Sequence, residues 1–184
     1  MLDKTPGVAS AINILNASTI ADERLQELSR AVGRSFGLRT YVSPAPLNLD
    51  RAFDAYRGQY NSTALLVQLV NAFAGTDEKR IAVVGVDLFI PVLTFVFGEA
   101  QLGGSSAVVS THRLANPFYG LPKNDELSFQ RLQKEVVHEL GHTFGLYHCH
   151  QFECVMRSST YVEEIDLKRL ALCSGCAEKL HSAR

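Results

Sequence analysis

The chain has 184 residues, 46% of them hydrophobic and 20% charged, so it is long enough to bury one sizeable core. Its formal net charge is −1 and it has no dense run of lysine or arginine, which argues against a nucleic-acid partner. The most apolar run, residues 88–97, contains Pro91 and is too short to cross a membrane, so we expect no membrane partner and interpret the run as a buried strand region.

Residues 1–15 lack the charge and apolar pattern of a secretory signal, so we expect a cytoplasmic protein. In that reducing compartment, cysteines serve as metal ligands or nucleophiles more often than they form disulfides. The sequence has no internal repeat and no long linker, so we expect a single domain over residues 1–184.

The first predicted helix covers residues 20–36, with Ser18 or Thr19 as its N-terminal cap and Gly37 just beyond its end. The elements predicted after it are a strand over 38–42, a helix over 62–73, and strands over 81–86, 94–100 and 106–111. Because helices alternate with strands, we predict the α/β fold class.

A long helix with one apolar side is predicted over residues 125–144, with Asn124 as its cap. A last helix is predicted over residues 161–172, because Val162, Ile165 and Leu172 share one helical face. The candidate chemistry lies at the end of the long helix.

Three histidines follow one another at fixed spacing near that helix end. Because His138 and His142 are four residues apart, they project from the same helical face and can share one metal ion. Glu139 points about a quarter-turn aside, where it can act as a general base on a metal-bound water without being a ligand. Gly145 can end the helix with a positive φ and turn the chain so that His148 returns as third ligand.

Three protein ligands leave one position of a zinc ion open to water, which is typical of a catalytic rather than a structural site. A bare H-E-x-x-H string arises by chance in many sequences, but the extended pattern from His138 to His148 fixes five positions. We therefore predict a catalytic zinc on His138, His142 and His148.

Four cysteines follow the histidines, spaced as C-x4-C and then C-x2-C. They are Cys149, Cys154, Cys173 and Cys176. Four thiolates at these spacings suit a closed tetrahedral zinc site, so we predict two zinc ions per chain, one catalytic and one structural. Two disulfides or a redox C-x-x-C remain as alternatives. A structural zinc would fix the segment that carries His148, because Cys149 follows it directly.

The run from His138 to Cys176, with Met156 inside it, resembles the archaemetzincins, a family of the metzincin clan of zinc peptidases. Segments 87–91 and 95–100 also resemble that family. The resemblance implies a metzincin-like mixed sheet with helices, a methionine turn at Met156 beneath the metal, and residues 94–100 as the strand that binds peptide. It implies subdomains over 1–145 and 146–184 on either side of the cleft. Where some clan members have a tyrosine, this chain has Ser158.

We therefore expect a monomeric zinc metallopeptidase that acts on peptides or small proteins, with Glu139 as the general base. The first rival is a catalytically silent zinc-binding or regulatory protein on the same scaffold. The second is a nucleic-acid-binding zinc knuckle, which would need a basic face that the cysteine region lacks.

Overall fold

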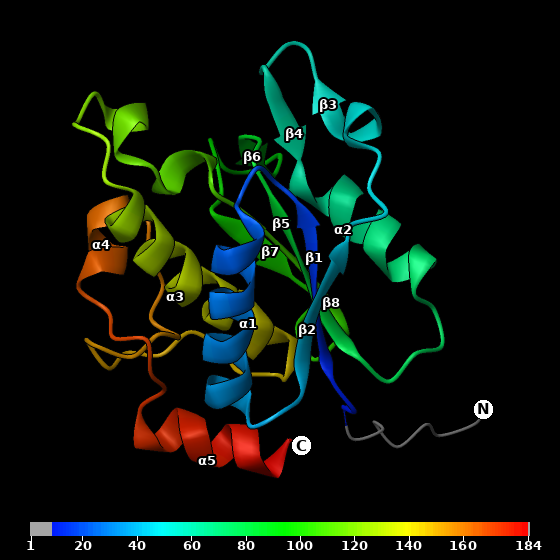
Figure 1. Cartoon of the computed structure of the whole chain (residues 1–184), viewed down its shortest axis with the longest axis vertical. Coiled ribbons are helices and arrows are strands. Elements are labelled where there is room, and N and C mark those ends of the chain that lie inside the picture. Colours follow the sequence, from blue (N-terminus) through cyan, green and yellow to red (C-terminus); the bar gives the residue numbers. More distant parts are fainter. Residues whose placement is uncertain (1–8, 184) are drawn as a thin grey trace.

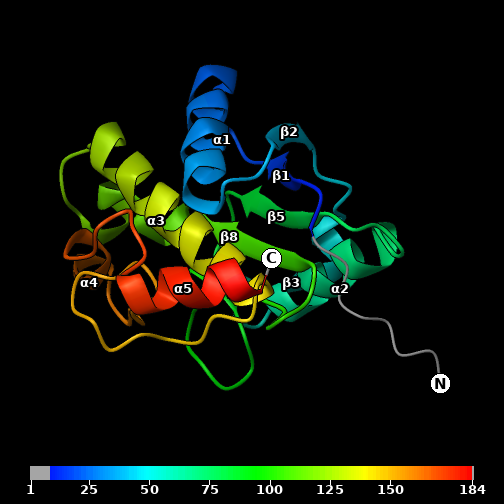
Figure 2. The ribbon, with the colours of Figure 1, turned by 90° about the horizontal axis from the view of Figure 1, so that it is seen from below.

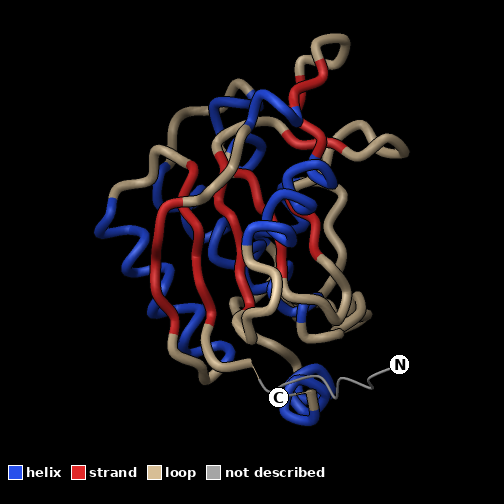
Figure 3. Tube along the Cα trace, turned by 90° about the vertical axis from the view of Figure 1, so that its right-hand side faces the viewer, coloured by secondary structure: helices blue, strands red, loops and turns tan. Residues whose placement is uncertain are grey.

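A five-stranded sheet lies at the centre of the computed structural model, which describes residues 9–183. Its strand order is β2-β1-β5-β8-β7, and only β7 runs antiparallel to its neighbour. The strands are β1 (Ile12–Ala17), β2 (Thr40–Pro44), β5 (Lys79–Val84), β7 (Gly98–Ala100) and β8 (Ser106–Ser110). Figure 3 shows them side by side. The mixed sheet confirms the predicted fold class.

A second, smaller sheet extends from one end of the first (Figure 1). Its strands are β3 (Phe53–Asp54), β4 (Gln59–Asn61) and β6 (Leu88–Phe89). Strand β4 leads directly into helix α2, and β6 leads into the segment that becomes one wall of the candidate cleft.

Helices cover both faces of the main sheet, as Figures 1 and 2 show. Helices α1 (Asp22–Phe36) and α3 (Asp125–Thr143) pack on one face, and α2 (Ser62–Ala72) packs on the other. The side chains of β5 alternate between the two cores: Ile81 belongs to the first and Ala82 to the second. The sheet therefore gives helix α3 a rigid support.

The long helix predicted over residues 125–144 is confirmed as α3. Its cap is Asn124, whose side-chain oxygen accepts a hydrogen bond of 3.0 Å from the backbone N–H of Leu127. The other predicted elements that lie within a few residues of their expected places are α1, β2, α2, β5 and β8. Among residues 9–183, none of the helices combines the length and apolar content needed to span a bilayer.

Two details of the N-terminal region differ from prediction. Strand β1 was not predicted, because Asn13 interrupts its apolar run; in the fold this side chain is buried and accepts a hydrogen bond of 2.9 Å from the hydroxyl of Ser43. Helix α1 begins after Ala21, which offers no side-chain cap, so the predicted caps Ser18 and Thr19 are wrong. Gly37 does end the helix, with a φ of 59°.

The apolar run 88–97 is not one buried strand. After β6 the chain turns, with a backbone hydrogen bond of 3.0 Å from Leu93 to Ile90, and Val92 is 84% exposed. Of the strand predicted over 94–100, only Gly98–Ala100 is regular, preceded by a single bridge between Leu88 and Val96. Pro91 has no N–H to donate to a ladder, which fits a turn at this point.

The helix predicted over residues 161–172 is also wrong in extent. Helix α4 covers only Val162–Asp166, because residues 169–171 instead bond to the loop after the histidines, through Arg169 to Glu153 and Val155 to Ala171. A further helix, α5 (Ser174–Ser182), begins within the C-x-x-C sequence and was not predicted. The local sequence could not predict either difference, because both depend on contacts between segments that are distant in the chain.

Candidate functional site

The structure brings the three predicted histidines together. His138 and His142 lie on the last turns of α3, and Gly145, with a φ of 83°, turns the chain so that His148 comes back against them. Each offers a ring nitrogen within 4.8 Å of the other two. The ring of His138 stacks on that of His148 with centroids 5.3 Å apart.

The hydrogen bonds of the rings fit this set to a metal ion. The Nδ1–H of His138 donates to the carbonyl of Val155 at 2.8 Å, and that of His142 donates to the carbonyl of Leu146 at 2.7 Å. Since a carbonyl only accepts, each Nε2 is left with a lone pair, and the two Nε2 atoms lie 3.1 Å apart. Two facing lone pairs repel unless a cation lies between them. Burial also lowers the pKa of His138 well below its usual value, which favours the neutral form that binds metal.

Glu139 lies in the same cleft as the histidines and is 6% exposed. Burial, and then the nearby carboxylate of Glu135, raise the pKa of Glu139 well above its usual range. Strand β7 approaches closely here, because a Cβ on Gly98 would lie 2.7 Å from the Cγ of Glu139. The close approach of Gly98 therefore fixes where the Glu139 side chain can lie.

The histidines and Glu139 line a cleft of about 400 Å³. One wall is residues 93–100, which end in β7 at the edge of the main sheet; residues 158–160 form another wall. Ser158 lines this wall, whereas the nearby Tyr161 is 65% exposed and is not among the lining residues. The cleft therefore has an open strand edge on one side of the histidines.

A network of polar side chains holds the wall formed by residues 93–95. Asp87 accepts two hydrogen bonds from Arg113, at 2.6 and 2.7 Å, and the guanidinium of Arg113 lies 4.1 Å from the ring centroid of Phe95. The amide of Gln59 donates both to Asp87, at 2.9 Å, and to the carbonyl of Thr94, at 3.0 Å. These contacts fix the wall although it is not a regular strand.

We expect Asp87→Asn to destabilise the protein by about 1.5–3 kcal/mol at pH 7, the usual value of hydrogen bonds to charged groups. Burial would raise the pKa of Asp87, but the hydrogen bonds from Arg113 and Gln59 hold it below 3.8. The stability it contributes is therefore present above pH 3.8 and is lost as the pH falls through the lower folded-state pKa. Urea unfolding of the wild type and of Asp87→Asn at pH 7 and near pH 3 measures this loss of stability. If the difference in the free energy of unfolding is the same at both pH values, the shape of the side chain matters and its charge does not.

Met156 is fully buried, and its side chain packs against Gly141 of α3. A Cβ on Gly141 would collide with the sulfur of Met156 and would also lie 3.5 Å from Leu146. Glycine is therefore required inside this helix, between His138 and His142.

Alanine normally stabilises a helix interior relative to glycine by about 1 kcal/mol. We expect the opposite sign for Gly141→Ala, a loss of about 1–3 kcal/mol, because the new methyl group overpacks against Met156. The matched control is Gly175→Ala in α5, where a Cβ would meet nothing within 4 Å and no destabilisation is expected. Thermal unfolding of zinc-loaded protein compares the two, and equal effects would contradict the packing argument.

The four predicted cysteines also meet, with sulfur atoms within 4.8 Å of one another and no disulfide among them. Backbone N–H groups donate to two of the sulfurs at 3.4 Å, from Gln151 to Cys149 and from Cys173 to Cys154. Cys173 stands at the N-cap position of α5, and the backbone N–H of Cys176 lowers the pKa of the Cys173 thiol to about 7. This chemistry suits a tetrahedral metal site.

His148 and Cys149 are neighbours in the chain but belong to different clusters, as the sequence predicted. The backbone N–H of Cys149 donates to the carbonyl of Met156 at 2.9 Å, so the loop between them is closed. Residue Val155 of the same loop accepts from His138. One loop therefore carries parts of both clusters.

Some residues at the site were not predicted from the sequence. Lys79 donates to the carbonyls of Gly104 and Thr143, at 2.7 and 2.8 Å, and so holds the end of α3. Glu135 lines the cleft and pairs with Lys168. The sequence contains one indication of the role of Glu135: it lies four residues before Glu139, so the two carboxylates share one helical face.

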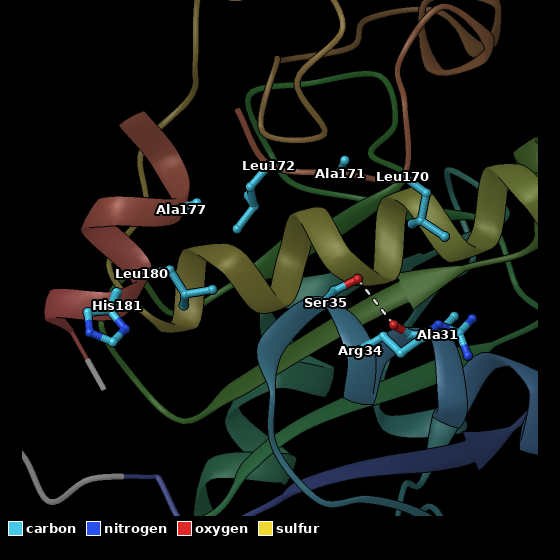
Figure 4. A pocket seen from close by; sticks show the side chains of 9 residues that line it. All are labelled: Ala31, Arg34, Ser35, Leu170, Ala171, Leu172, Ala177, Leu180 and His181. Carbon is cyan, nitrogen blue, oxygen red and sulfur yellow. Dashed lines mark hydrogen bonds between the residues drawn. The ribbon is translucent and has the colours of Figure 1, made fainter. Parts of the chain in front are cut away.

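A second hollow, of about 440 Å³, lies between α1 and α5, away from the histidine cluster (Figure 4). Leu170, Leu172 and Leu180 line it, with Arg34 and His181 among the other lining residues. Its chemistry is unrelated to that of the cleft.

The other histidines of residues 9–183 lie outside both clusters. The ring of His112 packs edge-on against Phe118, with centroids 5.2 Å apart. His150 and His181 are exposed on the surface. The structure therefore groups only His138, His142 and His148 among the histidines of residues 9–183.

Comparison with known proteins places these features in a family. Residues 41–182 match the model of peptidase family M54. The archaemetzincin of Methanocaldococcus jannaschii is 37% identical over 88% of this chain and 87% of its own length. Among solved structures, a zinc-dependent peptidase from Methanocorpusculum labreanum has a TM-score of 0.81 at 30% identity, over 92% of this chain and all of that one. The archaemetzincin of Methanopyrus kandleri has a TM-score of 0.81 at 31% identity, over 100% and 98%.

Proposed function

The chain belongs to peptidase family M54 and is a zinc metallopeptidase, and from this premise we propose that His138, His142 and His148 hold its catalytic zinc. The observation that carries the proposal is the distance of 3.1 Å between the Nε2 atoms of His138 and His142. In each ring the Nδ1–H donates to a backbone carbonyl, so the lone pair of Nε2 is free to bind the metal. When bound, the zinc would polarise the scissile carbonyl and acidify water.

In the proposed reaction Glu139 is the general base. It takes a proton from the attacking water and delivers it to the leaving amine, so no covalent bond forms between chain and substrate. Two features of the structure support this role: Glu139 lines the cleft beside the histidines, and it lies outside the group of mutually close ligand atoms. A carboxylate beside the metal, but not bound to it, suits proton transfer.

We propose that the peptide lies along residues 94–100, at the edge of the main sheet. Strand β7 pairs with β8 on one side and ends the sheet on the other, which leaves backbone groups to bind an extended peptide. Met156, packed against Gly141, would form the methionine turn. The chain would act as one catalytic domain, residues 1–184, with subdomains over 1–145 and 146–184.

The test is the zinc content of the protein and of two ligand variants, measured by elemental analysis at saturating zinc. We expect two zinc ions per chain, one of which is lost in His142→Ala and the other in Cys173→Ser. The exposed His150, next to Cys149 but outside both clusters, gives the control His150→Ala, which should retain both ions. A wild type that holds only one zinc ion, and keeps that ion in both ligand variants, would overturn both site assignments.

A further inference from the structure

Helix α3 carries a fourth functional side chain in line with the two histidines and Glu139. Glu135, His138, Glu139 and His142 follow one another at i, i+3, i+4 and i+7, so they form one stripe on a single helical face. Glu135 lines the same cleft, and its side chain is 4% exposed. Carboxylates bind zinc readily, yet no oxygen of Glu135 belongs to the group of mutually close ligand atoms in the described chain.

Lys168 holds the Glu135 side chain. Its Nζ donates to Oε1 of Glu135 at 3.2 Å, and the lysine side chain is 0% exposed. Lys168 follows α4, so it reaches the stripe from the segment beyond the cysteine loop. A fully buried ammonium is costly unless it is paired, and such pairs are poor sources of stability.

A clamp between α3 and α4 is already provided by other side chains. Arg131 makes two hydrogen bonds of 2.7 Å with Asp166, and Lys134 donates to the carbonyls of Ile165 and Asp166 at 3.0 and 3.2 Å. Lys168 lies deeper, with a fully buried side chain, and pairs with a carboxylate that lines the same cleft as the three histidines. Its place beside the metal cluster, rather than its link to α4, distinguishes it.

We propose that Lys168 is a positioning residue that holds the Glu135 carboxylate away from the catalytic metal, so that a coordination position stays open for water and substrate. The inference rests on the proposed histidine site. Without Lys168, the other lysine that acts on Glu135 is Lys134, whose ammonium is held by the carbonyls of Ile165 and Asp166. The metal would then be the cation free to pair with the Glu135 carboxylate. Glu135 would then turn along the helical stripe and become a fourth protein ligand.

The experiment loads the histidine site with Co²⁺ and the cysteine site with Zn²⁺, and subtracts the spectrum of His142→Ala protein prepared in the same way. In Lys168→Met we expect the d–d absorption to weaken and shift as a ligand is added, with tighter metal binding and kcat/KM lower by about 10- to 100-fold. The double variant Lys168→Met/Glu135→Gln and the single variant Lys168→Arg should restore the wild-type spectrum. An unchanged spectrum in Lys168→Met overturns the proposal.

The matched control is Lys134→Met, which removes a lysine that joins the same two helices. Lys134→Met should lower the stability of the protein and leave the Co²⁺ spectrum unchanged. A spectral change equal to that of Lys168→Met would show that Lys168 is only a structural clamp and would overturn the proposal.

The Lys168→Met variant can also be tested if it does not fold without metal. In that case Co²⁺ must restore its fold, because the bound metal would pair with the Glu135 carboxylate. Protein that stays unfolded with saturating Co²⁺ contradicts the proposal. A wild type that binds no Co²⁺ at the histidines would instead refute the proposed function.

Discussion

Replacing Glu139 by glutamine is expected to lower kcat/KM for peptide hydrolysis by about 10²- to 10⁴-fold, the usual contribution of a general acid–base group. Glutamine keeps the shape of the side chain in its close contact with Gly98, but it cannot accept the proton of the attacking water. The three histidines and their carbonyl partners are unchanged, so the zinc content should stay at the wild-type value. The measurement is cleavage of a mixed peptide library by both proteins, alongside elemental analysis.

The control for this substitution is Glu126→Gln, on the same helix. The carboxylate of Glu126 is 57% exposed and pairs with Arg24, far along α3 from the cleft, so kcat/KM should stay within about twofold. If Glu139→Gln retains wild-type activity, another group is the base. If the wild type cleaves no peptide of the library while both metal sites are filled, the catalytically silent scaffold becomes the better interpretation.

The meeting of the histidines and of the cysteines could be predicted because the signals for both are local or depend only on spacing. On α3 the cap, the apolar stripe and the histidine spacing all lie within one continuous element, which the structure confirms. The meeting of His148 with the helix needed only a glycine able to adopt a φ of 83°. The four cysteines meet as expected, although the helix that carries Cys176 was not predicted.

Features that depend on distant partners could not be predicted. Strand β1 contains a buried Asn13 whose partner, Ser43, lies on β2. The segment after α4 resembles a helix by its apolar spacing, but its backbone bonds go to the cysteine loop, as between Val155 and Ala171. The pairing of Glu135 with Lys168 likewise joins residues 33 positions apart. The apolar periodicity of a sequence indicates which face of a helix or strand is buried, but it does not indicate which residues pack against that face.

The two metal clusters should bind zinc cooperatively, because one loop serves both. His148 and Cys149 are adjacent in this loop, and its residue Val155 accepts the hydrogen bond that orients His138. Loss of the cysteine-bound ion in Cys173→Ser should free the loop and weaken zinc binding at the histidines by about 5- to 150-fold, the usual range of coupling between sites.

Coupling of binding free energies is reciprocal, so the effect must also appear in the other direction. In His142→Ala, zinc should bind the cysteine cluster more weakly by the same factor, whereas His150→Ala should change neither affinity. Competition with a chromogenic chelator under limiting zinc gives both affinities. Equal, non-zero coupling in the two variants would show that the cysteine zinc stabilises the third histidine through the shared loop. Affinities that are independent of one another would show instead that residues 148–156 keep their conformation without the second ion.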